Sequence, residues 1–317
     1  MKKWLALGLV AGSIAGQAAW AAFPDKPVRV TVAFAPGAST DIIARMLAEP
    51  MGAALGQPMV VENKPGAGGN IATQQVKAAT PDGHTLLMHS VAVSVNPSLF
   101  RQAGYDLMKD FEPVAMAGVT PNLLFVNPSV KANTLAELIA LARTTPMSYA
   151  SSGNGTTTHL GAELLFRSLA GVDIVHVPHQ PAAASVAVIG GAVPIGSTSM
   201  PPVVPHAKSG KVRPIAVMSL QRSPVLPEVP TVAELGYPGF EASTWFAVFA
   251  PAGTPAPVLD RLNQEFNRVL QSADITEKFG KQSLSVQPLD RAALKTYISG
   301  EVTKWGKVVR DAGIKVD

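Results

Sequence analysis

The sequence predicts an α/β protein whose strands and helices alternate and build two mainly parallel sheets, each flanked by helices. Three observations carry this prediction. Short runs rich in β-branched residues are followed by a polar or glycine-containing turn and then by a helical pattern of apolar residues. These units fall into two groups within 317 residues, a length that suits two domains. A helical tail follows the second group.

The N-terminal group begins with a strand predicted over residues 28–34, where β-branched residues dominate. The helical pattern that follows starts at Asp41, and we expect Pro50 to kink or end that helix, because proline lacks an N–H and crowds the preceding turn. Short strands joined by helices imply βαβ connections and mainly parallel pairing. The remaining units of this group are a strand over 58–62, a helix over 71–79 and a strand over 84–90.

The second group starts with a strand predicted over residues 122–128. Thr134 and Glu137 have the spacing of a capping box and begin the next helix, and Thr231 and Glu234 repeat that spacing. The other predicted segments are a strand, polar loop and helix over 148–171, a strand over 172–178, further alternation over 182–196 and 211–219, a strand over 244–251, and helices over 258–270 and 289–310.

The composition indicates a globular protein with large cores. Hydrophobic residues make up 47% of the chain and charged residues 15%, which excludes a disordered chain. The formal net charge is +4, and it falls to +2 if the first 21 residues are removed with Lys2 and Lys3. That charge is too small to indicate nucleic-acid binding, and no later run approaches the ~18 apolar residues of a membrane-spanning helix.

The first 21 residues have the pattern of a secretory signal peptide. Lys2 and Lys3 precede an apolar run of about 13 residues, which is too short to span a bilayer, and small residues at Ala19 and Ala21 fit a signal peptidase site. We therefore predict residues 1–21 as a signal peptide cleaved near Ala21; the alternative is a buried N-terminal helix. Without cysteine the chain has no lipobox thiol and no disulfide, so the fold depends on its cores.

Two strand-to-helix junctions place small and polar residues at a helix start. The first, residues 34–47, contains Ser39 and Thr40, and the second, residues 59–76, is rich in glycine. A helix N-terminus leaves N–H groups unpaired and carries roughly half a positive charge, and glycine lets a ligand approach the backbone. Two such termini in one cleft can hold a carboxylate without an arginine. The alternative is that these are ordinary capped turns.

A third loop of the same kind spans residues 151–163 and packs hydroxyls, an amide and two glycines ahead of a helix. His159 lies in the first or second turn of that helix, where it either hydrogen-bonds a ligand or packs. In the first junction we expect Asp41 to cap its helix and order the loop, because a bare acid facing an anionic ligand would repel it.

The familiar enzyme motifs are absent from the sequence. The stretch "GAGGNI" has Ile71 where a dinucleotide fingerprint requires a third small residue, and there is no nucleophile elbow, phosphate-binding loop or HExxH. The six histidines lack metal-ligand spacing, and Pro178 separates His176 from His179. The sequence therefore indicates no enzyme, no cofactor and no metal site; an exported hydrolase is the strongest enzyme alternative.

Several long motifs, in matching order over essentially the whole chain after the N-terminal segment, resemble the substrate-binding proteins of tripartite tricarboxylate transporters, the Bug (Bordetella uptake gene) family. The motifs are "FPDKPVRVTVAFAPGASTDIIARMLAEPMGAALGQPMVVENKPGAGGNIA", "TPDGHTLLMHS", "DFEPVAMAGVTPNLLFVNP", "YASSGNGTTTHLGAELL", "GVDIVHVPH", "RSPVLPEVPTVAELGYPGFEASTWFAVFAPAGTP" and "KWGKVVRDAGIK".

This resemblance implies a two-lobe periplasmic binding protein of type II, in which each lobe is a mainly parallel sheet flanked by helices. Lobe one is expected to contain residues 22–123 plus 245–317, and lobe two residues 124–244. The chain would cross between them twice, through "NLLFVNP" and "ASTWFAVFAP", and these crossings would form the hinge.

The resemblance also implies the ligand-binding positions. First-lobe loops grip a ligand carboxylate, and the strand end "MHSVAVS" with the loop of residues 151–159 meets the far end of the ligand. An aromatic wall at the hinge would cover the ligand, unless those aromatic residues simply pack there. The expected ligand-binding residues are Phe34, Ala38, Ser39, Thr40, Asp41, Gly68, Gly69, Ser90, Ser94, Ser152, Asn154, Thr156, Thr157, His159, His179, Thr198, Trp245 and Phe246.

The sequence departs from the family pattern in three places. Ala38 replaces a glycine of the first loop, and Thr198 stands where the family has an acid, which argues against amino-acid ligands. The segment "VPHQPA" replaces a run with a tyrosine and a basic residue, so His179 and Gln180 redefine the distal pocket. A neutral, hydroxyl-lined distal site suits an aromatic or aliphatic carboxylate.

The partners implied by the resemblance are a small carboxylate ligand and the membrane permease subunits of a tripartite carrier. The expected protein is a periplasmic monomer that captures the ligand between its lobes and delivers it to the permease, with no nucleic-acid partner. The alternative that shares this fold and site is a ligand sensor for a periplasmic signalling partner.

Overall fold

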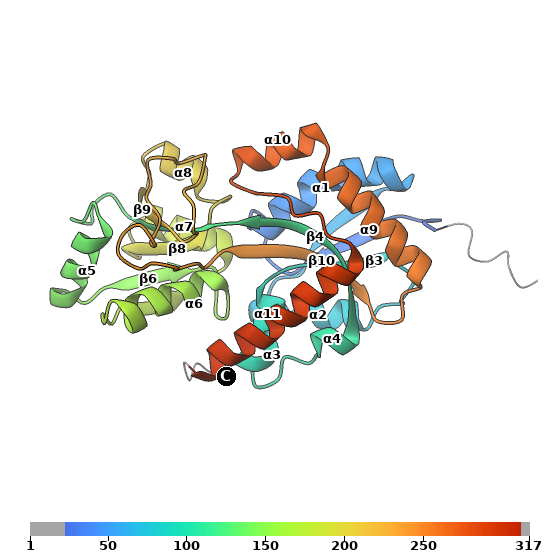
Figure 1. Cartoon of the computed structure of the whole chain (residues 1–317), viewed down its shortest axis with the longest axis horizontal. Coiled ribbons are helices and arrows are strands. Elements are labelled where there is room, and N and C mark those ends of the chain that lie inside the picture. The colour runs from blue at the N-terminus through green and yellow to red at the C-terminus, as the bar shows by residue number, and fades with distance from the viewer. Residues whose placement is uncertain (1–22, 312–317) are drawn as a thin grey trace, which may run out of the picture.

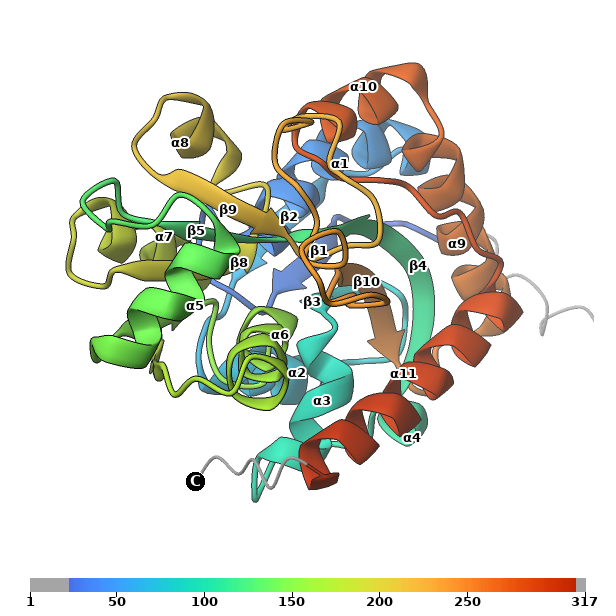
Figure 2. The same cartoon turned by 60° about the vertical axis from the view of Figure 1, so that its left-hand side comes forward.

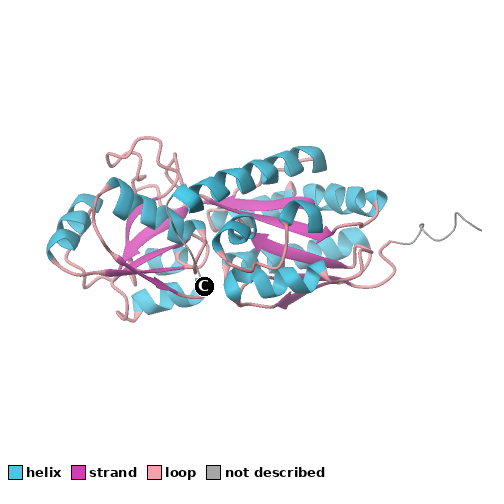
Figure 3. Ribbon diagram, turned by 90° about the horizontal axis from the view of Figure 1, so that it is seen from below, coloured by secondary structure: helices cyan, strands magenta, loops and turns pink. Residues whose placement is uncertain are grey.

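The computed structural model describes residues 23–311, in which two groups of strands and helices lie side by side (Figure 1, Figure 3). The first group holds a five-stranded sheet in the order β2-β1-β3-β10-β4, formed by β1 (Val28–Val32), β2 (Met59–Asn63), β3 (Thr85–Ser90), β4 (Phe111–Thr120) and β10 (Thr244–Pro251). The second holds a sheet in the order β7-β6-β8-β5-β9, formed by β5 (Asn122–Val126), β6 (Ser148–Ser151), β7 (Val175–Pro178), β8 (Ile195–Ser199) and β9 (Arg213–Val217).

The two sheets share one pattern of strand directions. In the first, β1 pairs in parallel with β2 and β3, while β10 pairs antiparallel with both β3 and β4. In the second, β6 pairs in parallel with β7 and β8, while β5 pairs antiparallel with both β8 and β9. Only one described strand in each sheet therefore runs against the others, which confirms the prediction of two mainly parallel sheets.

Helices cover the sheets of both groups (Figure 2). Around the first sheet lie α1 (Ser39–Leu55), α2 (Asn70–Lys77), α3 (Ala92–Leu99), α4 (Leu107–Asp110), α9 (Ala256–Leu270), α10 (Ala273–Lys281) and α11 (Arg291–Asp311), with a 3₁₀ turn over Ala67–Gly69 before α2. Around the second lie α5 (Leu135–Thr144), α6 (Thr157–Glu163), α7 (Pro181–Ile189) and α8 (Val204–Lys208), with a π-helical turn over Leu164–Leu169 after α6.

The chain passes from one sheet to the other at two places. Pro121 separates β4 of the first sheet from β5 of the second, and Ser243 precedes β10, which returns to the first sheet. A buried polar network joins both crossings: the Asn122 side-chain amide donates to the Ala242 carbonyl at 2.6 Å, and the Thr244 hydroxyl donates to Asn122 Oδ1 at 2.8 Å. The hydroxyls of Thr157 and Thr244 are also hydrogen-bonded to each other.

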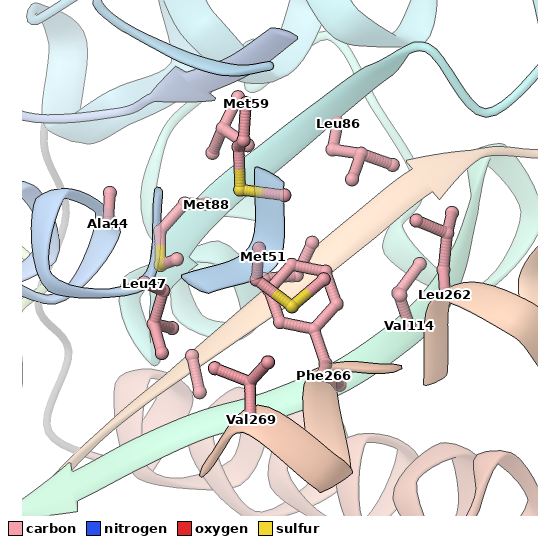
Figure 4. Close-up of a cluster of buried hydrophobic side chains, with 14 of the residues drawn as sticks. Ala44, Leu47, Met51, Met59, Leu86, Met88, Val114, Leu262, Phe266 and Val269 are labelled. Carbon is pink, nitrogen blue, oxygen red and sulfur yellow. The ribbon is translucent and has the colours of Figure 1, made fainter. Parts of the chain in front are cut away.

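Each sheet carries an apolar core on both faces, as expected for strands buried on two sides. Figure 4 shows one of these cores, in which Leu47 and Met51 of α1 meet Met88 of β3 and Phe266 of α9. Each such side chain contributes roughly 1.5–3 kcal/mol when it is fully buried. The packing of α1 and α9 against the sheet therefore fixes the position of the first strand-to-helix junction, residues 34–47.

The C-terminal helix is tied to the strand that returns from the second sheet. The Glu301 carboxylate of α11 accepts hydrogen bonds from the indole nitrogens of Trp245 and Trp305, both at 2.8 Å. Tyr297 packs edge-on against Trp245, with the ring centres 6.1 Å apart. These contacts hold α11 against the start of β10.

Several sequence-based expectations need correction. Helix α1 begins at Ser39 rather than Asp41 and runs through Pro50 to Leu55, so of the two outcomes expected at Pro50, a kink or an end, the helix does not end there. Proline removes one backbone hydrogen bond, but the burial of Met51 and Leu55 holds the last turns in place.

The first predicted capping box begins α5, although Glu137 accepts from the backbone of Asn133 rather than Thr134. The second box forms fully between Thr231 and Glu234 but opens a turn and not a helix.

No element was expected over α3, β4 or α10. The predicted signal peptide, residues 1–21, lies outside the described residues. Within residues 23–311, no helix is long and apolar enough to cross a membrane.

Candidate functional site

A small inner cavity of about 20 Å³ lies between the facing ends of the two sheets. Both groups of elements contribute to its wall, so the cavity lies at the interface between them. The first sheet and its helices contribute Phe34, Thr40, Ser90, Val91, Thr244 and Phe246, and the second contributes Ser152, Thr156, Thr157, Thr158 and Pro181. With room for about one water molecule, the cavity shows that the two groups are closely apposed here.

A larger outer compartment of about 370 Å³ adjoins this cavity, and Phe34 and Ser152 line both spaces. A volume of roughly 300–1,000 Å³ is typical of small-molecule sites. The rest of the outer wall comes from the glycine turn before α2, from Phe100, and from two segments of the second group. Those lining residues are Gly66, Ala67, Gly68, Gly69, Gly153, Asn154, Pro178, His179 and Gln180.

Helix N-termini from both groups converge on the inner cavity. Thr40 lies in the first turn of α1, Ser90 and Val91 immediately precede α3, and Pro181 is the first residue of α7. The N–H groups of a first helical turn have no partner in their own helix and carry partial positive charge. Of the described residues that line the two compartments, none is Lys, Arg, Asp or Glu, so an anion bound here would be held by backbone, hydroxyl, amide and imidazole groups.

Asp41 orders the first loop and is itself fully engaged. Its carboxylate accepts hydrogen bonds from the Gly37 backbone at 2.9 Å, from Arg45 at 2.9 Å and from the Asn63 side chain at 2.9 Å. Burial disfavours the charged form, but these hydrogen bonds outweigh it and hold the pKa of Asp41 below its usual value. The loop-ordering role expected for Asp41 is therefore present, whereas the helix-capping role is not, because the N-cap position is Ala38.

Ser39 makes a contact between the two groups. Its hydroxyl is hydrogen-bonded at 2.7 Å to the hydroxyl of Ser199 at the end of β8, and both residues are buried. Ala38 is fully buried in the core beside it. Neither Ala38 nor Ser39 is among the described residues that line the two compartments.

Ser152 has a polar group available to a ligand. Its hydroxyl oxygen is buried without a hydrogen-bond partner, and the residue is only 7% exposed. Because Ser152 lines both the inner and the outer compartment, this hydroxyl lies where the two spaces meet. A buried hydroxyl without a partner is costly, and a ligand oxygen placed here would satisfy it.

The loop that carries Ser152 is held in shape by its own threonines. The Ser152 backbone N–H donates to the Thr158 hydroxyl at 3.0 Å, and the hydroxyls of Thr156 and Thr158 are 2.7 Å apart. The Thr156 side chain also accepts from the His159 backbone at 3.3 Å, as an N-cap should. The hydroxyls that face the cavity are therefore fixed in direction before a ligand arrives.

Histidines back this loop on the side away from the cavity. The His159 ring stacks on the His176 ring with 4.0 Å between the ring centres, and the Gly155 N–H donates to His159 Nδ1 at 3.3 Å. Burial lowers the pKa of His159 to about 4, with a further contribution from the positive charge of Arg167. Burial and the neighbouring His159 and His179 lower the pKa of His176 to about 3. Both rings are neutral at physiological pH and serve as packing groups.

Of the other expected residues, Phe34, Thr40, Ser90, Thr156, Thr157 and Phe246 lie on the inner cavity, and Gly68, Gly69, Asn154 and His179 on the outer compartment. The hydroxyl of Thr157 is already bonded to Asn122 and Thr244.

Like Ala38, Ser39, Asp41 and His159, three further expected residues line neither compartment. Ser94 is inside α3 and donates its hydroxyl to the Val91 carbonyl at 2.7 Å, because the predicted strand end continues as a helix. Trp245 faces the core and Glu301, opposite in direction to Phe246 on the same strand. Thr198 is fully buried within β8.

Further lining residues are not among the expected ligand-binding residues: Gly66, Ala67, Val91, Phe100, Gly153, Thr158, Pro178, Pro181 and Thr244. Thr158 and Thr244 each neighbour an expected residue, so the hydroxyl-rich pattern of their segments was the available signal. Phe100 gave no such signal, because it reaches the site from the end of α3, an element that was not predicted.

Comparisons with known proteins agree on one family. The sequence profile described as "Tripartite tricarboxylate transporter family receptor" matches residues 43–314. Protein BugT of Bordetella pertussis is 38% identical over 299 residues, which cover 93% of this chain and 91% of that protein.

Solved structures show the same architecture. The periplasmic binding protein BugD is similar with a TM-score of 0.87 and 34% identity, covering 92% of this chain and 99% of that one. A protein of R. palustris solved with adipate has a TM-score of 0.89 and 33% identity, covering 93% and 99%. MatC of Rhodopseudomonas palustris, solved with bound malate, has a TM-score of 0.85 and 33% identity, covering 90% and 100%.

Proposed function

From the premise that this chain belongs to the tripartite tricarboxylate transporter receptor family, we propose that it captures a small carboxylate between its two sheets and hands it to a tripartite-type membrane transporter. The family is one of solute-binding receptors, so binding rather than turnover is the activity. The relatives solved with adipate and malate support a carboxylate as the class of ligand.

The observation that carries this proposal is the lining of the inner cavity. First-turn groups of α1 and the starts of α3 and α7 face one space together with hydroxyls, and the Ser152 hydroxyl is buried there without a partner. Hydroxyls beside helix starts suit a carboxylate, and no described residue of the cavity lining is an acid that would favour a cation. We propose that Phe34, Thr40, Ser90, Ser152 and Phe246 contact the ligand, while Asp41 and Thr157 hold the loops that present it.

We propose that the two sheets belong to two lobes that open and close about the crossings. The strand pairings support crossings at Pro121 and Ser243, a small displacement from the boundaries expected after residues 123 and 244. The inner cavity, with room for about one water molecule, suits a closed arrangement, so a ligand enters when the lobes separate. Contacts made only on closure then shift the population to the closed form.

We propose a periplasmic location for the mature protein, with cleavage of the signal peptide near Ala21. The periplasmic structures among its relatives support this location. In this compartment the receptor acts as a monomer, and its closed form docks on permease subunits.

A binding screen of the mature protein, residues 22–317, tests the proposal. The panel holds aliphatic dicarboxylates, tricarboxylates, aromatic carboxylates and amino acids, and thermal stability is measured with each. A ligand at about a thousand times its dissociation constant stabilises by ~4 kcal/mol, which raises the melting temperature by very roughly 8–16 °C. A shift with one class of carboxylate, with the compound recovered unchanged, supports the proposal.

The control separates a retained ligand from an incorrect function. Denatured protein is extracted and examined by mass spectrometry, and the screen is repeated on refolded protein. If neither the refolded protein nor the native protein responds to any carboxylate, and no carboxylate is extracted, the proposed function is wrong. Product formation from an ester or amide would instead favour the hydrolase alternative.

A further inference from the structure

We propose that His179 makes the outer compartment select ligands whose far end donates a hydrogen bond. Hydroxy- or phenol-bearing monocarboxylates would then bind more tightly than dicarboxylates of the same length. This inference rests on the proposed function, because it places the first carboxylate of the ligand in the inner cavity. It concerns the other end of the ligand, which extends past Phe34 and Ser152 into the outer compartment.

The hydrogen bond that His179 makes fixes the position of its proton. His179 Nδ1 lies 2.9 Å from the carbonyl oxygen of Val177, and a carbonyl oxygen can only accept. The neutral ring therefore carries its proton on Nδ1, and Nε2 is left with a lone pair. His179 lines the outer compartment, so its remaining nitrogen offers an acceptor to the ligand. An acceptor attracts a hydroxyl and repels a carboxylate.

The rest of the outer wall supplies no charge for a second carboxylate. Of the described residues that line this compartment, His179 is the only ionisable one. The Gly69 N–H of the glycine turn is already bonded to the Gly66 carbonyl at 2.8 Å. The side-chain amides of Asn154 and Gln180 line the compartment and can donate, but no Lys or Arg does among the described lining residues, so a second carboxylate pays a desolvation cost that no opposite charge offsets.

Matched ligand pairs test the inference on the mature protein by calorimetry. The pairs are 6-hydroxyhexanoate with adipate, 4-hydroxybutanoate with succinate, and 4-(hydroxymethyl)benzoate with terephthalate, with hexanoate, butanoate and benzoate as references. For the pair that fits best, we expect the hydroxy acid to bind about tenfold more tightly than the dicarboxylate at about pH 8.

Two substitutions separate the two ring nitrogens. In His179→Asn a donor to the Val177 carbonyl can be kept while the group at the Nε2 position is lost, so the preference for the hydroxy acid should fall. In His179→Gln a polar group still reaches the Nε2 position, so more of the preference for the hydroxy acid should remain than in His179→Asn. His206→Gln, in α8 and outside both compartments, is the matched control and should behave as the unsubstituted protein.

The outcomes distinguish this inference from the proposed function. If dicarboxylates bind as tightly as the hydroxy acids at about pH 8, the inference is wrong while the proposed function stands. If no carboxylate of the panel binds, the proposed function itself fails. If His179→Asn keeps the full preference for the hydroxy acid over the dicarboxylate, the role proposed for Nε2 is wrong.

Discussion

Asp41 and Ser152 show two different states of a buried polar side chain at this site. Asp41 has several hydrogen-bond partners and uses them to fix the first loop, whereas the Ser152 hydroxyl has none. Sequence reasoning placed both among the ligand-binding residues, because it recognises polar loops but not which atoms are already satisfied. Asp41 therefore shapes the site, whereas the Ser152 hydroxyl is left without a hydrogen-bond partner.

The Ser152 hydroxyl should contribute to ligand affinity without contributing to stability. We expect Ser152→Ala to weaken carboxylate binding about tenfold or more, since a hydrogen bond to a charged group is lost. The melting temperature should be unchanged or slightly higher, because an unsatisfied buried hydroxyl is removed. Ser185→Ala is the matched control: its hydroxyl is also buried without a partner, but it lines neither compartment. Equal affinity loss in both variants would contradict a specific role for Ser152.

The buried histidines should make the protein less stable in mild acid. The pKa values of His89 and His159 are lowered to about 4 by burial, so the folded state keeps these rings neutral below the usual histidine pKa of about 6.5. The unfolded chain then binds more protons, and stability falls as pH decreases from about 6.5 towards 4.

Each such histidine contributes a slope of up to about 1.4 kcal/mol per pH unit in this window. Urea unfolding at about pH 7, 6 and 5 measures the slope, and His159→Gln should reduce it. A stability that stays level over this range, or an unchanged slope in the variant, would contradict the neutral buried state. His206→Gln provides the surface comparison.

The positions of the helices determine which of the expected residues line the two compartments. The prediction placed Ser94 at a strand end, but the chain turns into α3 after Val91, and the helix buries Ser94. The same helix brings Phe100 to the outer compartment. Local patterns did not reveal α3, because Pro97 lies within it and its apolar residues continue directly from those of β3.

Close contact between the backbone at Gly155 and side chains of α3 should govern closure. A Cβ added to Gly155 would lie 2.3 Å from Leu99 Cδ2 on the opposite side of the interface, and its φ is +75°. We expect Gly155→Ala to weaken ligand binding by about tenfold, since the lobes cannot approach fully, in addition to a backbone cost of roughly 1–2 kcal/mol in stability.

Gly210→Ala separates these two effects. Gly210 has a similar φ of +71°, but nothing lies within 4 Å of an added Cβ. It should lose a similar amount of stability and retain its affinity, as measured by urea unfolding and calorimetry. If both variants bind the ligand equally well, the contact between Gly155 and Leu99 does not limit closure.

Across the two sheets, the sequence was sufficient to predict two groups of mainly parallel strands, because most strands are short, largely apolar runs followed by a polar turn and a helical pattern. Strand order was not predictable from the residues alone, since it depends on which distant segments pair. The reversed strands β5 and β10 occupy the same position in the two sheets, and each follows a crossing of the chain. Tertiary pairing of this kind leaves no local signal.

The uncharged wall of the two compartments has a consequence for the environments in which this receptor can work. Affinity that depends on a surface arginine or lysine falls as salt rises, because the Debye length shrinks from about 30 Å at 0.01 M to about 8 Å at 0.15 M. Here the anion would be held by enclosed dipoles at very short range, which mobile ions do not reach. The dissociation constant should therefore vary less than about threefold between dilute buffer and roughly 0.5 M sodium chloride. A cell with such a receptor would therefore still bind its ligand at low concentration when the salt around it rises from that of fresh water to that of brackish water.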